Sequence, residues 1–137
     1  MQYKILIDSN VFFIPFYYNY DIIEELKLFL NRKDINYVGL YTLRKNIIEI
    51  EDKLKSTRSE KSKKLYKLVL DYINKNNINI IETNKNNEKT DRLIVNISLS
   101  GDFIVCTQDK NLRYILRKLK VPVIFYSNKE LHIIYGN

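Results

Sequence analysis

Hydrophobic positions along the chain fall into two alternating patterns. Short unbroken apolar runs, typical of strands buried on both faces, alternate with segments in which apolar residues recur every three or four positions, as in helices. The runs predict strands at residues 4–7, 35–41, 78–81, 103–107, 122–126 and 131–135, and the periodic segments predict helices at 22–31, 43–54, 58–74, 91–98 and 112–119. This alternation predicts one α/β domain over residues 1–137, a three-layer α/β/α fold with a central, mostly parallel twisted sheet and an antiparallel last strand.

Two of the predicted helices begin with the spacing of a capping box. Asp21 and Glu24 stand three residues apart before one periodic segment, and Thr57 and Glu60 do so before another. We therefore expect the side chains of Asp21 and Thr57 to cap the helices that follow them.

Residues 11–18 are mostly aromatic or aliphatic and are interrupted by Pro15. We expect this segment to form a loop or a broken helix that covers the core. Alternatively, one or two exposed tyrosines in it would form a surface on which bases stack.

Four acidic residues are predicted at one edge of the sheet. The carboxyl ends of parallel strands and the amino ends of the following helices share an edge, and ligands bind there in open α/β sheets. Asp8 and Asp109 each follow a strand, Asp91 opens the helix after the third strand, and Glu49 lies about two turns into the helix after the second. The structural alternatives are a turn residue for Asp8, a helix cap for Asp109 and a first-turn acid for Asp91.

Such a cluster of acids implies a cation. Two carboxylates about 5 Å apart repel by roughly 3 kcal/mol at an effective dielectric constant near 20, and a divalent ion removes that penalty. The only histidine is His132 and the only cysteine is Cys106, and we expect both to be structural. The ligands would therefore be oxygen atoms, which favours Mg²⁺ or Mn²⁺.

The rest of the chain is strongly basic. It carries 23 Lys and Arg against 16 Asp and Glu, a net charge of +7, and setting the four acids aside leaves 23 − 12 = +11. A basic body suits a polyanionic partner, and a metal-filled acidic pocket on such a body suits hydrolysis of a phosphodiester. Candidate phosphate-binding residues, which would otherwise be solvated surface, are Lys61, Lys64, Arg113 and Arg117.

The sequence also predicts the cellular location of the protein. No apolar stretch approaches the roughly 18 residues of a membrane span, and Met1 leads almost directly into the first strand, which leaves no room for a signal peptide. A single cysteine cannot form an internal disulfide. We therefore expect a cytoplasmic protein without a membrane partner.

The sequence resembles the PIN-domain family of nucleases along nearly its whole length. The resemblance lies in the segments ILIDSN (5–10), EI (49–50), TDRLI (90–94), GDFIVCTQDKNLR (101–113) and VPVIFY (121–126). Within the family, the chain is most similar to archaeal small PIN proteins related to ribosomal-RNA processing endonucleases. The VapC toxins of toxin–antitoxin pairs are the next most similar.

The resemblance implies a metal-dependent endoribonuclease directed at single strands, which uses metal-activated water and leaves a 5′-phosphate and a 3′-hydroxyl. The partner would be RNA, either single-stranded or a structured rRNA precursor. If the chain is a toxin, an antitoxin would be a further partner. If the chain forms a homodimer, residues 12–20 would be the contact surface. The implied metal ligands and catalytic residues are Asp8, Glu49, Asp91 and Asp109, with Asn10 and Thr107 supporting them through hydrogen bonds.

Several alternatives remain open from the sequence. Glu51 rivals Glu49, because Asn46 and Ile50 stand near places where the family has a hydrophobic residue and a Leu. Asp102 rivals Asp91, although we expect it in a turn at the opposite edge of the sheet. A non-catalytic RNA-binding PIN scaffold fits the same pattern. A phospho-receiver or nucleotide-binding domain fits less well, since the chain has only three glycines and no Gly-rich phosphate loop.

Overall fold

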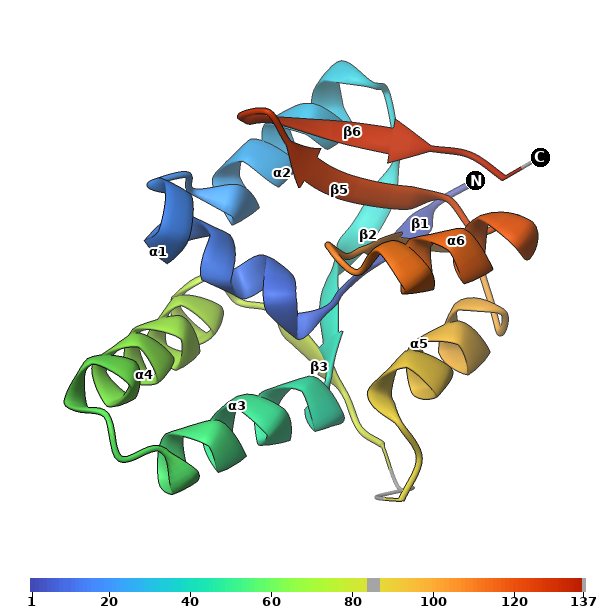
Figure 1. Ribbon diagram of the computed structural model, residues 1–137. Helices are drawn as coiled ribbons and strands as arrows, with labels where there is room; N and C mark the ends of the chain where they lie inside the picture. Colours follow the sequence, from blue (N-terminus) through green and yellow to red (C-terminus); the bar gives the residue numbers. More distant parts are fainter. Residues whose placement is uncertain (84–86, 137) are drawn as a thin grey trace.

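A computed structural model of the chain describes residues 1–83 and 87–136 (Figure 1). Its centre is a six-stranded sheet in the order β3-β2-β1-β4-β5-β6. All neighbouring strands pair in parallel except β5 and β6, which are antiparallel. The strands are β1 (Tyr3–Ile7), β2 (Tyr37–Leu43), β3 (Asn79–Ile81), β4 (Phe103–Cys106), β5 (Val123–Ser127) and β6 (Glu130–Ile134).

Helices cover both faces of this sheet, so the predicted three-layer α/β/α fold is confirmed (Figure 1). Side chains of β1 alternate between the faces: Ile5 and Ile7 belong to one buried cluster and Leu6 to the other. The first cluster packs against α2, α3 and α4, and the second against α5 and α6. The helices are the 3-10 helix η1 (Ser9–Phe13), α1 (Ile14–Tyr18), α2 (Ile22–Arg32), α3 (Arg44–Ser56), α4 (Glu60–Lys75), α5 (Thr90–Ser98) and α6 (Lys110–Lys118).

The second strand lies two residues later in the chain than predicted. The backbone N–H of Ile35 donates to the carbonyl of Leu30 at 2.9 Å, which ties this residue to the end of α2 instead of to the sheet. At the other end, Thr42 and Leu43 pair with β3 and extend the strand. The apolar run identified the buried segment correctly, but its ends as a strand were decided by the hydrogen bond to the end of α2 and by the pairing with β3.

Neither predicted cap is made by the expected side chain. The side chain of Asp21 makes no capping hydrogen bond to α2. Instead, the Tyr72 hydroxyl accepts from the backbone N–H of Ile23 at 3.0 Å and donates to Asp21. On α4, the cap is Ser59, whose Oγ accepts from Ser62 N at 3.2 Å, so the helix begins later than the Thr57 prediction.

The aromatic segment after β1 is a broken helix, as expected. The chain turns through η1 and continues as α1, which carries Pro15 in its first turn, where a missing N–H costs nothing. Residues 11–14 are buried, whereas Tyr17 and Tyr18 are each 61% exposed. Among the described residues, no helix is both long enough and apolar enough to cross a membrane.

Candidate active site

Asp8 lies at the carboxyl end of β1, in the middle of the sheet, and is only 6% exposed. Its neighbour β4 ends beside it, and the backbone N–H of Asp8 donates to the carbonyl of Cys106 at 2.9 Å. A carboxylate at this depth loses much of its hydration, so the surrounding residues must supply hydrogen bonds in its place.

Four donors from three segments satisfy this carboxylate. Oδ1 accepts from the backbone N–H of Ser9 at 2.9 Å and from Asn46 Nδ2 at 3.1 Å. Oδ2 accepts from Thr107 Oγ1 at 2.8 Å and from Asn10 Nδ2 at 3.3 Å. Because both oxygens are held by residues of different elements, the Asp8 side chain has a fixed orientation.

The donors do not offset the cost of burying the charge. Burial raises the pKa of Asp8, and the negative charges of Asp91 and Glu49 raise it further, while the hydrogen bonds from Thr107 and Ser9 lower it. The net pKa is raised. Asp91 and Glu49 therefore lie close enough to Asp8 to act on its charge, as expected for acids at one sheet edge.

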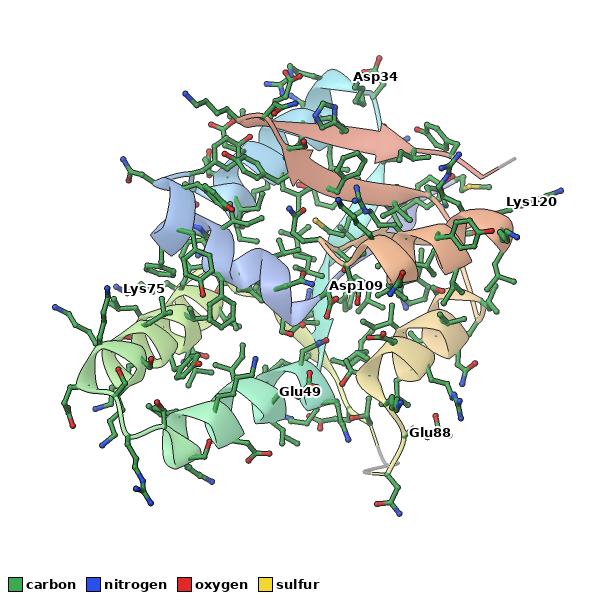
Figure 2. All side chains as sticks on the ribbon, in the orientation of Figure 1. Asp34, Glu49, Lys75, Glu88, Asp109 and Lys120 are labelled. Carbon is green, nitrogen blue, oxygen red and sulfur yellow. The ribbon has the colours of Figure 1, made fainter. Side chains whose placement is uncertain are left out.

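The two candidate glutamates of α3, Glu49 and Glu51, act on different charged groups. Glu49 is partly buried on α3 (Figure 2) and acts on the charge of Asp8. Glu51 is exposed. The hydrogen bonds that Arg44 donates to Glu82 raise the pKa of Arg44, and the charge of Glu51 raises it further. The charge of Glu49 thus acts on Asp8, and the charge of Glu51 acts on Arg44.

Asp109 combines two structural roles next to Asp8. Its Oδ1 caps α6 by accepting from the backbone N–H groups of Asn111 and Leu112 at 2.9 and 3.1 Å. Its own N–H donates to Thr107 Oγ1 at 3.1 Å. Thr107 therefore links Asp109 to Asp8, and Figure 2 shows Asp109 at the start of α6.

The two remaining acids lie where the topology predicted. Asp91 is exposed in the first turn of α5, after β3. Asp102 precedes β4, and its carbonyl accepts from the N–H of Lys4 near the start of β1. Asp102 is therefore a residue of the opposite edge and does not belong to the site.

The structure does not draw the four acids into one ready-made metal cluster. Within residues 1–83 and 87–136, no three Asp, Glu, His or Cys side chains lie close enough together to hold an ion. The site is thus a fixed carboxylate, Asp8, with further acids around it.

The sequence matches the model of the PIN-like domain family over residues 5–129, a range that includes all four acids. The chain belongs to this family. A solved structure described as the PIN domain endonuclease Utp24 superposes with a TM-score of 0.76 at 17% sequence identity, covering 98% of this chain and 94% of that one. At this identity the likeness shows a shared fold. None of the curated protein sequences matches the chain.

Family membership confirms the resemblance drawn from the sequence and excludes the phospho-receiver alternative. In this PIN-like domain, two residues contribute to the site although the sequence analysis gave them no role there. Asn46 is fully buried; it donates to Asp8, and its Oδ1 accepts from the backbone N–H of Leu43 at 3.2 Å. A polar residue in the first turn after a parallel strand was the signal that could have identified it.

Gln108 is the second overlooked residue. Its side chain bonds the backbone of Tyr126 in both directions, donating at 2.8 Å and accepting at 2.7 Å, and so prolongs the pairing of β4 with β5. Its backbone N–H donates to Asn10 Oδ1 at 3.2 Å. Gln108 therefore holds the connection between Thr107 and Asp109 against β5.

The candidate phosphate-binding residues occupy two separate helices. Lys61 and Lys64 are exposed on the first turns of α4. Arg113 and Arg117 are partly buried on α6, and the guanidinium of Arg113 lies 4.1 Å from the ring centre of Phe125. Their role in binding nucleic acid stays a prediction.

Replacing Thr107 with valine is expected to raise the pKa of Asp8 further, because the hydrogen bond from Thr107 lowers it. The change also leaves a buried acceptor short of a donor, which costs about 1–3 kcal/mol of stability. A raised carboxyl pKa makes folding less favourable as pH rises through it, so the loss should be greater at neutral than at acidic pH. NMR titration of the Asp8 carboxyl carbon and urea unfolding measure both effects. Thr57→Val, at a partly exposed position away from Asp8, is the control. An unchanged titration of Asp8 in the Thr107→Val protein would contradict the hydrogen bond from Thr107 to Asp8.

Proposed function

We propose that this PIN-like domain is a divalent-metal-dependent endoribonuclease. The observation that carries the proposal is Asp8, a buried carboxylate with a raised pKa, fixed by four donors at the carboxyl edge of the sheet. Perturbed pKa values of titratable groups cluster at functional sites. Membership of the PIN-like family supports the proposal, and so does the fold shared with an endonuclease.

The residues present fit a hard divalent cation. The acids are oxygen donors, and the repulsion that raises the pKa of Asp8 is of the kind that a cation relieves. Glu49 is partly buried and Asp91 is exposed, and the negative charges of both act on Asp8. The ion would be held by Asp8, Glu49, Asp91 and Asp109.

Bound Mg²⁺ or Mn²⁺ would polarise a phosphate oxygen and lower the pKa of a water molecule. The residues of the chain supply orientation. Asn46 and Thr107 approach Asp8 from opposite sides and prevent it from rotating, and Thr107 fixes the backbone of Asp109 at the same time. Exposed lysines on α4 and arginines on α6 would hold the phosphate backbone of the substrate through charge.

The proposal is tested by cleavage of single-stranded RNA in Mg²⁺, Mn²⁺ and EDTA, with single-stranded DNA of the same sequence beside it. We expect cleavage of RNA only with a divalent ion, and products that carry a 5′-phosphate and a 3′-hydroxyl. Equal cleavage in EDTA would contradict the metal dependence. Cleavage of DNA alone would contradict the choice of RNA.

For the biological role we propose rRNA processing, with a VapC-type toxin as the alternative; both rest on the sequence resemblance. A processing enzyme should cut an rRNA precursor at one position. A toxin should arrest growth when expressed alone and be inhibited by a small antitoxin. A homodimer through residues 12–20 is a further proposal, and monomers at high concentration in sedimentation experiments would contradict it.

A non-catalytic RNA-binding scaffold is the second candidate function. It is favoured by one observation: in the described part of the chain, no three acids are gathered closely enough to hold an ion. A scaffold would bind RNA without cutting it, and Mn²⁺ would leave its melting temperature unchanged. A metal-dependent rise in the melting temperature would count against this candidate.

A further inference from the structure

A cavity of about 240 Å³ opens at Ser9 and Asn10, the two residues that follow Asp8. It lies where η1 and α1 face the hairpin of α3 and α4, two elements that both pack against η1 (Figure 1). Its lining residues come from all of these helices and are Ser9, Asn10, Phe13, Tyr17, Lys53 and Tyr66.

One wall of the cavity is bonded to the candidate catalytic carboxylate. The backbone N–H of Ser9 donates to Asp8 Oδ1 at 2.9 Å, and the side chain of Asn10 donates to Asp8 Oδ2 at 3.3 Å. Two of the residues that line the cavity therefore contact Asp8 directly. By contrast, a larger cavity of about 410 Å³ lies at the opposite edge, around Tyr3 and Asp102, away from the site.

The other walls are aromatic and held in place by one another. The ring of Phe13 stacks on Tyr17 with centroids 5.9 Å apart and meets Tyr66 edge-on at 6.0 Å. Phe13 is 9% exposed, whereas Tyr17 is 61% exposed and has ring contacts with Phe13 and Tyr18. A positioned, exposed aromatic ring is the element on which single-stranded nucleic acids stack their bases.

The one charged residue of the lining is a cation. Lys53 lies on α3, one helical turn beyond Glu49, and within the described residues it takes part in no ion pair. An aromatic ring beside an unpaired lysine matches the two halves of a nucleotide, since the base stacks and the phosphate takes the charge. The volume of the pocket, about 240 Å³, lies below the roughly 300–1,000 Å³ of sites for drug-sized molecules, which suits a group as small as one base.

We propose that this cavity, the base pocket, receives one unpaired base of the RNA strand next to the phosphate that is cut. Tyr17 stacks on the base, and Lys53 contacts an adjacent phosphate. The proposal rests on the proposed ribonuclease function and deepens it, because a base can enter the pocket only from a strand that is locally unpaired. The enzyme would therefore select single-stranded positions through this pocket.

Binding and cleavage can be separated experimentally. The Asp8→Asn protein in EDTA cannot cut through the proposed site, so its affinity for a fluorescent RNA of about eight nucleotides reports binding alone. In this background, Tyr17→Ala is expected to weaken binding by roughly 5- to 100-fold, the range found for loss of one base–aromatic stack. The matched control is Tyr114→Ala, since Tyr114 is 58% exposed, lies on a helix and has Lys118 beside its ring, but lines no part of the pocket.

A second readout follows stacking directly. The chain contains no tryptophan, so Tyr17→Trp introduces a single tryptophan into the pocket. The tryptophan is excited selectively, apart from the tyrosines that remain in the chain. Its emission should be quenched by RNA, whereas emission from Tyr114→Trp should change little. An RNA that lacks one base should bind the Tyr17→Trp protein more weakly than the intact RNA does. Lys53→Gln should lower the affinity for RNA more than Lys55→Gln, a control on the same helix.

The outcomes distinguish this proposal from the proposed function. If RNA binds but Tyr17→Ala and Tyr114→Ala have equal affinities, the base pocket is wrong and the nuclease proposal stands. If neither the wild-type chain nor the Asp8→Asn protein binds RNA, both proposals fail. Selective loss of affinity in Tyr17→Ala, with quenching confined to Tyr17→Trp, would establish the pocket.

Discussion

Replacing Asp8 with asparagine should lower metal-dependent RNA cleavage by about 100-fold or more while the domain stays folded. Residues that only orient a metal ligand account for roughly 10–100-fold in affinity or activity, and Asp8 is the proposed ligand itself. The amide keeps the shape of the carboxylate and can still accept hydrogen bonds from Ser9 and Asn46. Initial rates in Mn²⁺, with circular dichroism as the test of folding, measure this prediction.

The same substitution changes the pH dependence of stability with a defined sign. Burial raises the pKa of Asp8 above its ordinary value of 3.8. The stabilising contribution of this carboxyl is therefore present below about pH 3.8 and is lost as pH rises through the higher pKa of the folded state. Asp8→Asn should lack this component in EDTA. The control is Asp102→Asn at the opposite sheet edge, and equal loss of cleavage in both variants would contradict the role of Asp8.

Replacing Asn46 with aspartate should produce the largest loss of stability. One oxygen of the new carboxylate can still accept from Leu43 N, so the other takes the place of the amide nitrogen, which lies 3.1 Å from Asp8 Oδ1. Two buried carboxylates at that distance cannot both stay ionised without a large penalty. We expect the free energy of unfolding in EDTA at neutral pH to fall by about 3–5 kcal/mol.

Acid should reverse much of this loss, because a proton shared between the two carboxyls replaces the missing amide hydrogen. Urea unfolding at neutral and acidic pH measures the effect. Asn96→Asp on the exposed side of α5 is the control and should change stability by less than about 0.5 kcal/mol. Equal stability of the Asn46→Asp protein at both pH values would contradict the contact between Asn46 and Asp8.

The sequence was sufficient for the features that depend on local pattern. β1 and β4 are unbroken apolar runs that each end near an acid, so their burial and the position of Asp8 and Asp109 at one edge follow from the parallel fold. The period of α3 gave its buried face, with Ile47 and Ile50 in the core. The sequence favoured Glu49, which lies next to that face, with Glu51 further round the helix as its rival. The structure adds that the charge of Glu49 acts on Asp8.

Features made by contacts between distant segments were not predictable. Tyr72 caps α2 from a helix 49 residues further along the chain, and no local spacing encodes that contact. Asn46 reaches Asp8 across 38 positions, and Gln108 bonds the backbone of Tyr126, so their roles depend on how the strands meet. The base pocket likewise needs Tyr66 of α4 to pack against Phe13 of η1.

Binding of a divalent ion to Asp8 is the central claim, and it does not depend on knowing the RNA target. The most direct measurement is the anomalous diffraction of Mn²⁺ in crystals of the wild-type protein, with crystals of Asp8→Asn beside them. We predict a manganese peak bonded to the Asp8 carboxylate, with Glu49, Asp91 or Asp109 as a further ligand, and no peak in the variant. Wild-type crystals without manganese at this edge, or with it bound only elsewhere, would contradict the account.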